Sequence, residues 1–167
     1  MLQPNIPNNE KQRLQALWSL GLLDTEPEER FDRITKRAVE EIKVPISTIT
    51  LIDKDREWYK SCQGIHLKEL PRNISFCAHA LTSNQLLIVE DTLQDKRFVD
   101  NPQVTGVPYI RFYAGVPLHN RQSGQIVGVF CINDTKPRRL TKEEFVMLFD
   151  LAHDAEQELM KNRHSKE

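Results

Sequence analysis

The sequence predicts an α+β fold in which helices pack on one face of an antiparallel sheet. Amphipathic helical patterns stand near both ends of the chain, and at least five short strand patterns lie between them, paired as hairpins. The chain has 167 residues, of which 39% are hydrophobic and 28% charged. That length and composition are sufficient for one domain with a hydrophobic core of its own.

The first helix is expected over residues 9–20, where Leu14, Leu17 and Trp18 share one stripe. Gly21 follows and supplies the C-terminal stop.

The second helix is expected to start at Thr25-Glu26-Pro27-Glu28, which has the pattern of a capping box. Apolar residues then recur at steps of three and four, so one face of this helix is buried: Phe31, Ile34, Ala38 and Ile42. Pro45 is expected to end it.

After this helix the pattern changes to that of strands. We expect strands at 46–52, 57–62, 86–89, 111–118 and 125–132. Ser75 is a plausible N-cap for a short helical segment over 75–81, and the polar stretch 91–108 is long enough to hold short helical turns. A second capping box at Thr141 opens a last helix that runs to about Lys161.

The domain boundaries follow from this reading. Residues 1–8 are expected to be a flexible lead-in, 9–162 a single domain, and 163–167 a polar tail. The net charge of −1 offers no basic patch for nucleic acid, and the longest aliphatic run, 86–89, is far too short to cross a membrane. Three widely spaced cysteines and the lack of a signal sequence favour reduced thiols and a cytoplasmic location.

Several stretches resemble the GAF domain of bacterial signalling proteins, as found near the N-terminus of sensor histidine kinases and diguanylate cyclases. They are Leu20–Thr25 with Pro27–Asp32, Ser75–Ala80, Asp95–Pro102 and Ile110–Leu118. The resemblance covers about residues 10–159. It implies a sheet of five to six strands with the N- and C-terminal helices on one face. On the other face it implies a pocket that in relatives binds cyclic nucleotides, tetrapyrroles or small anions, or stays empty.

Strand alternation suggests which side chains face that pocket. Ile110, Phe112, Ala114, Val116 and Leu118 form an apolar set suited to packing under helices. The opposite set contains Arg111 and Tyr113. The candidate ligand-binding residues are Thr50, Trp58, Cys77, His79, Asp91, Arg111, Tyr113 and Cys131.

Two of these candidates carry open alternatives. Arg111 is either a clamp for an anionic ligand or, as we prefer, the partner of Asp91 or Glu90 in a structural ion pair. Of the adjacent Trp58 and Tyr59, one should be core and the other either stacks on a flat ligand or simply covers the sheet.

The thiol of Cys77 and the imidazole of His79 suggest either metal binding or nucleophilic catalysis. Two ligands fall short of a zinc site, and a spacing of two on a helix turns the side chains apart. The resemblance adds two comparisons: the three cysteines are not clustered as in free-methionine-sulfoxide reductases, and Cys77-Ala78-His79 departs from the Cys-His pair of bilin-binding domains. We therefore expect pocket lining, no catalytic residue and no metal, and the sequence names no cofactor.

The last helix carries Phe145, Leu148, Ala152, Ala155 and Leu159 at coiled-coil spacing, a pattern that also suits a helix docked on a sheet. We expect a regulatory domain, not an enzyme, that binds a small molecule of unknown identity and forms a homodimer through its terminal helices. The alternatives are a thiol-dependent redox enzyme on the same fold and a dimerisation scaffold without a ligand.

Overall fold

The computed structural model describes residues 1–83 and 85–161, so the predicted polar tail lies outside the described residues. The helices are α1 (Glu10–Trp18), α2 (Glu29–Ile42), α3 (Phe76–His79), α4 (Pro102–Thr105) and α5 (Lys142–Leu159). The strands are β1 (Ile46–Ile52), β2 (Arg56–Gln63), β3 (Glu69–Pro71), β4 (Leu87–Val89), β5 (Phe112–His119) and β6 (Ile126–Asp134). Three short 3₁₀ turns complete the list, at Arg72–Ile74, Ala80–Thr82 and Thr92–Gln94.

The strands form one six-stranded antiparallel sheet in the order β3-β2-β1-β6-β5-β4. This confirms the predicted α+β fold. The central pair joins β1 to β6, with Ile46 opposite Asn133 and Leu51 opposite Gly128. All seven residues of β1 are buried, as expected for a strand with neighbours on both edges and packed layers on both faces.

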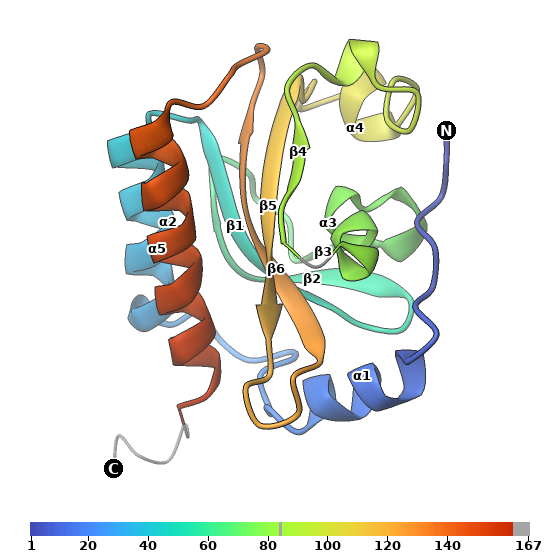
Figure 1. The fold of residues 1–167 in the computed structure, drawn as a ribbon, viewed down its shortest axis with the longest axis vertical. Helices are drawn as coiled ribbons and strands as arrows, with labels where there is room; N and C mark the ends of the chain where they lie inside the picture. The colour runs from blue at the N-terminus through green and yellow to red at the C-terminus, as the bar shows by residue number, and fades with distance from the viewer. Residues whose placement is uncertain (84, 162–167) are drawn as a thin grey trace.

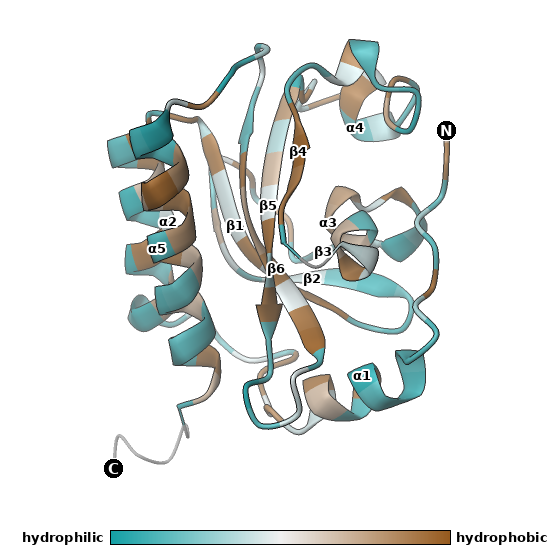
Figure 2. Cartoon of the chain, viewed as in Figure 1, coloured by the Kyte–Doolittle hydropathy of each residue, from teal (hydrophilic) through white to brown (hydrophobic). Residues whose placement is uncertain are grey.

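Helices α2 and α5 lie side by side on one face of the sheet, while α1 lies across one end (Figure 1). The faces of α2 and α5 that point away from the sheet are largely hydrophilic (Figure 2). Their inner faces join the larger hydrophobic core, which contains Phe31, Ile34 and Leu148 together with Leu51 and Phe130 of the strands.

The opposite face of the sheet is covered by α3, α4 and the chain around them (Figure 1). A second core forms there around Phe76, Phe98 and Tyr113. The rings of Phe76 and Phe98 stack with their centroids 4.3 Å apart. The lead-in runs along this side, where the Leu2 amide donates to the Arg97 carbonyl.

The C-terminal helix begins as predicted: the Thr141 hydroxyl accepts from the Glu144 amide, and the Glu144 carboxylate accepts from the Thr141 amide. The residues at coiled-coil spacing in α5 pack against the sheet and α2: Leu148 and Ala155 have no exposed surface, and Phe145 is half-buried. Val146 and Phe149 are the large apolar side chains that α5 leaves exposed.

The predicted capping box at Thr25 is wrong. Helix α2 begins four residues later, at Glu29, and the side chain of its N-cap residue Glu28 does not cap the helix. The Thr25 hydroxyl instead donates to the Leu22 carbonyl and accepts from the ammonium group of Lys60. The Thr25 hydroxyl therefore binds Lys60, which is distant in the sequence, and not a backbone amide of the helix that follows it.

Three smaller expectations also need correction. Trp18 is exposed and donates to Asp53 at 3.0 Å, so it is not part of the buried stripe of α1. Helix α2 ends at Ile42, three residues before Pro45, because Lys43 adopts a left-handed conformation with φ of 62°. Ile110 precedes β5 and packs in the core on the α3 side, away from α2 and α5.

A β-bulge interrupts the pairing of β1 with β2. Thr50 lies opposite Tyr59 and Ile49 lies opposite Ser61, which leaves Lys60 as the extra residue. The bulge changes the alternation of side chains, so that Lys60 and Ser61 both reach the helix side, where the Ser61 hydroxyl donates to Asp32.

Candidate functional site

A cavity of about 30 Å³ lies between the sheet and the layer formed by α3 and α4. Its polar walls come from β1, β2, β5, β6 and α3, and apolar residues close it from the loops. The lining residues are Ile46, Thr48, Glu57, Tyr59, Ile65, Leu67, Phe76, Cys77, Gln103, Pro108, Ile110, Tyr113, Cys131 and Asn133. The volume is that of one or two water molecules.

The buried side chain of Tyr113 lines this site. Its phenol ring lies over Gly115, where a Cβ atom would overlap the ring and its hydroxyl. Only glycine leaves room for that ring, which explains why β5 has a glycine inside a buried strand. The hydroxyl donates to the Cys77 sulfur at 3.1 Å, and burial raises the pKa of Tyr113 well above its ordinary value.

Two thiols meet beside this hydroxyl. Cys131 lies opposite Gly115 in the β5–β6 ladder and opposite Thr48 in the β1–β6 ladder. The Thr48 hydroxyl and the Cys131 sulfur share a hydrogen bond of 2.9 Å. Burial, and next the neighbouring Cys131 thiol, raise the pKa of Cys77 well above its ordinary value.

Glu57 provides a carboxyl group at another wall of the cavity. The residue is 4% exposed, and its carboxylate accepts from the Ser75 hydroxyl, with Tyr59 and Cys77 as further hydrogen-bond partners. Burial raises the pKa of Glu57 despite these three hydrogen bonds. Ser75 is also the N-cap of α3, accepting from the Ala78 amide at 2.9 Å, so the short helix and the carboxyl group are held together.

Asn133 is the polar residue of the cavity that the fold leaves unsatisfied. It is 6% exposed, and among the described residues no group donates to its side-chain oxygen Oδ1. A buried polar atom without a partner costs about 1–3 kcal/mol. Within the described residues no cluster of three or more His, Cys, Asp or Glu side chains is arranged to hold a metal ion.

Three of the eight predicted site residues line this cavity: Cys77, Tyr113 and Cys131. Thr50 lies two residues after the lining residue Thr48 on β1 and does not line the cavity; its hydroxyl donates to the Val129 carbonyl at 3.3 Å. His79 packs edge-on against Phe98 on the outer side of α3. Burial and then Arg97 lower the pKa of His79.

Trp58 belongs to the core on the helix side, and the ring that reaches the cavity is that of Tyr59. The preferred prediction for Arg111, an ion pair with Asp91 or Glu90, is wrong, and the anion clamp stays a prediction. Arg111 lies just before β5 and donates to the carbonyls of Val104 and Ile110, so it ties the loop to the sheet without lining the cavity.

The expected partners of Arg111 have other roles. Asp91 accepts from the Leu93 amide at the 3₁₀ turn that follows it. Glu90 forms an ion pair with Arg139 at 3.5 Å.

Glu57 and Asn133 are the functional candidates that the sequence reading missed; Tyr59 was weighed against Trp58, and Trp58 was the residue chosen. Strand parity would have indicated Asn133, which has the same parity as Cys131 on β6. Alternation also holds on β2 before the bulge, so Glu57 and Tyr59 share the cavity side, while Trp58 and Lys60 face the helices.

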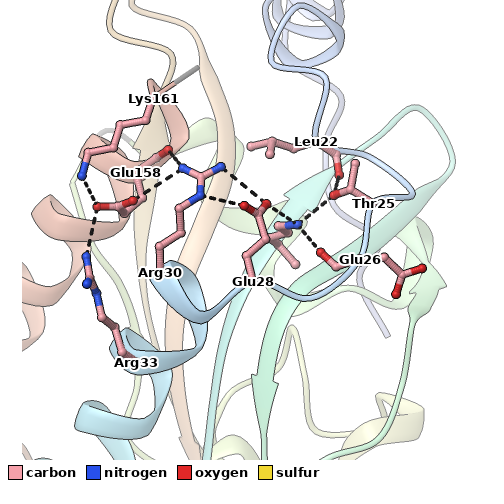
Figure 3. Close-up of polar contacts among 9 residues, drawn as sticks. Leu22, Thr25, Glu26, Glu28, Arg30, Arg33, Glu158 and Lys161 are labelled. Carbon is pink, nitrogen blue, oxygen red and sulfur yellow. Dashed lines mark hydrogen bonds and ion pairs between the residues drawn. The ribbon is translucent and has the colours of Figure 1, made fainter. Parts of the chain in front are cut away.

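A second polar centre lies on the helix side, beside a cleft of about 470 Å³. The buried ammonium group of Lys60 donates to Thr25 and to the Glu26 carbonyl, and it pairs with Glu28 at 2.8 Å. Figure 3 shows Arg30 between Glu28 and Glu158, donating to the Glu28 carboxylate and to the main-chain carbonyl of Glu158. This cluster ties the loop before α2 to the C-terminal end of α5.

The family model described as GAF domain matches residues 26–159. A curated relative, a cyclic di-GMP phosphodiesterase from Pseudomonas aeruginosa, is 36% identical over 150 residues, which are 90% of this chain and 25% of that protein. The chain therefore spans about a quarter of that relative's length.

Solved structures with this fold include a domain of a two-component sensor histidine kinase protein from Sinorhizobium meliloti. Its TM-score is 0.63 at 16% identity, covering 83% of this chain and 94% of that one. Free methionine-R-sulfoxide reductase from Neisseria meningitidis has a TM-score of 0.62 at 15% identity and covers 96% of both chains. At such low identity these likenesses show the fold alone.

The comparisons contradict one expectation from the sequence, that the chain is not an enzyme. The curated relative is named as a phosphodiesterase. Within the described residues, none of the helices combines the length and the apolar character needed to span a membrane.

Proposed function

Because the chain belongs to the GAF domain family, we propose that it is a regulatory domain in signal transduction that binds a small molecule in the cavity of about 30 Å³. The proposed site lies between the sheet and α3, with Tyr59, Tyr113 and Asn133 in its walls. In a protein such as the longer phosphodiesterase relative, occupancy of this site would control the activity of the rest of the protein.

The observation that carries the proposal is the unpaired side-chain oxygen Oδ1 of Asn133. The Oδ1 atom is buried and accepts no hydrogen bond from the described residues. Retaining such a group costs stability, whereas a leucine of similar volume would avoid that cost. A ligand that donates a hydrogen bond to Asn133 accounts for the asparagine.

The size of the cavity limits what binds without a rearrangement. Pockets for drug-sized ligands have volumes of about 300–1,000 Å³. A ligand of more than a few heavy atoms therefore requires the covering segments to move outward. Leu67 and Pro108, which lie on loops over the cavity, are the residues that we expect to move first.

We also propose that the domain forms a homodimer through α5. The buried face of α5 is committed to its own sheet, so the surface available to a second copy is the exposed one, with Val146 and Phe149. Phe149→Asp should then give a folded monomer, whereas Leu148→Asp should prevent folding. Light scattering that finds a monomer for the parent protein would contradict this proposal.

Native mass spectrometry of freshly purified protein tests ligand binding. A bound small molecule should appear with the parent chain and be lost in Asn133→Leu, while Asn73→Leu, the same change at an exposed position outside the cavity, should retain it. Retention by both variants would contradict binding at this cavity. Turnover of free methionine sulfoxide with loss of thiols would instead support the thiol-dependent enzyme considered as the alternative.

A further inference from the structure

Cys77 and Cys131 come together from different layers of the fold. The Tyr113 hydroxyl lies over Gly115, whose ladder partner is Cys131, and it donates to the Cys77 sulfur at 3.1 Å. In an antiparallel ladder the Cβ positions of two opposite residues are about 4.5–5.5 Å apart. The Tyr113 hydroxyl lies at the place where a Cβ of Gly115 would be, so it is close to the Cys131 side chain. The two thiols are accordingly hydrogen-bond neighbours, although they are 54 positions apart in the sequence.

The cavity is the route by which a reagent reaches these thiols. Both sulfurs are buried, with 2% of each residue exposed, and both residues line the space of about 30 Å³. A molecule the size of water fits there, while one with an aromatic ring or a peptide backbone does not. The dithiol is thus shielded from large reagents and open to small ones.

We propose that Cys77 and Cys131 form a reversible disulfide when hydrogen peroxide enters the cavity. One thiol loses its proton, the thiolate attacks a peroxide oxygen, and the O–O bond breaks to give a sulfenic acid and hydroxide, which takes up the proton that the thiol lost and becomes the first water. The second thiol attacks the sulfenic sulfur, its proton leaves with the hydroxyl group as a second water, and the S–S bond forms. Two thiols are oxidised and one peroxide is reduced to two waters.

The disulfide would join α3 to β6 and fix the cover of the cavity to its floor. The hydroxyls of Tyr113 and Thr48, which contact the two sulfurs, stay in place as hydrogen-bond partners. This inference does not depend on the proposed function, because the reaction needs no other ligand in the cavity.

The pH dependence of the reaction follows from burial. The titratable groups that face Cys77 are Cys131, Glu57, Tyr59 and Tyr113, and none of these side chains forms a cation. Burial raises the pKa of Cys77, so little thiolate is present at neutral pH. Oxidation should be slow at neutral pH and accelerate as the pH rises.

The experiment compares a small and a large oxidant on the reduced, folded protein. Hydrogen peroxide should remove two hydrogen atoms from the mass of the chain, and peptide mapping should find Cys77 linked to Cys131. Cumene hydroperoxide should give no such link over the same period. Cys77→Ser and Cys131→Ser should lose the crosslink. Cys62→Ser, the matched control, should keep it, because Cys62 lies at the half-buried end of β2 and donates to the Ile65 carbonyl.

Three results would overturn the proposal. The first is oxidation that stops at Cys62 while Cys77 and Cys131 remain thiols. The second is a crosslink that includes Cys62 or joins two chains. The third is equal rates for the two oxidants, which would show that access is not set by the cavity. A denatured sample, in which both oxidants reach every thiol, provides the reference for that comparison.

Discussion

Lys60 offers a direct test of how a buried charge stabilises this fold. The Lys60 side chain has no exposed surface, and its ammonium group donates to the Thr25 hydroxyl at 2.8 Å and to the Glu26 carbonyl at 2.6 Å. It also pairs with Glu28, which keeps a second cationic partner in Arg30 at 2.9 Å.

Lys60→Met removes the charge and keeps most of the length of the side chain. Breaking a buried ion pair by removing one partner costs about 3–5 kcal/mol. Two features place Lys60 at the lower end of that range: Glu28 remains paired with Arg30, and the new thioether would pack near the rings of Phe31 and Trp58. We expect a loss of about 3 kcal/mol, equivalent to a decrease in melting temperature of about 6–12 °C.

Urea denaturation followed by far-ultraviolet circular dichroism measures the free energy of unfolding. The matched control is Arg37→Met, which breaks the exposed pair between Arg37 and Glu41. That pair is the shorter one, at 2.7 Å against 2.8 Å, yet both its side chains are exposed to solvent and it should contribute little. Equal losses in the two variants, or no loss in Lys60→Met, would refute the reasoning from burial.

Three further predictions follow from the described contacts. Asn133→Leu should leave the free energy of unfolding unchanged or raise it by up to about 1–3 kcal/mol, because it removes a buried polar atom without a partner. A lower free energy of unfolding in urea would show that the Asn133 side chain has a structural role. Burial favours a higher pKa for Glu156, but hydrogen bonds from His119 and Arg121 outweigh it and lower the pKa to about 2. Glu156 therefore stabilises the fold above its unfolded pKa of about 4.5, and this contribution is lost as the pH falls toward 2; Glu156→Gln should flatten the stability profile in that window. Thr141→Ala should cost about 1 kcal/mol through loss of the cap of α5, and an unchanged urea midpoint would contradict that estimate.

The sequence predicted those elements whose signals are local. The bounds predicted for β1 were the observed ones, and the capping box at Thr141 formed because both of its partners lie within one turn. The similar pattern at Thr25 failed because Lys60, 35 positions away, binds the threonine hydroxyl and the Glu28 carboxylate. A local pattern cannot reveal that a distant ammonium group competes for the same oxygens.

The site was predictable where strand alternation holds without interruption. Tyr113 was assigned to the pocket by parity, and it lies there. Arg111 shares that parity, but β5 begins only at Phe112, so alternation does not apply to Arg111. Glu57 has the parity of Tyr59 on β2 and was missed because Trp58 was taken as the pocket residue of that strand; β3 and the Ser75 turn bury its carboxylate.

The order of strands has a consequence for synthesis of the protein on the ribosome. The central strand β1 has β2 and β6 as its neighbours, and β6 is the last strand to be made. While residues 64–125 are being synthesised, the nascent chain presents one edge of β1 without its partner, and that strand consists of Ile46–Ile52, rich in isoleucine and threonine. Such an edge pairs readily with other extended chains. The interval between β1 and β6 is therefore the period in which we expect this chain to depend most on chaperones.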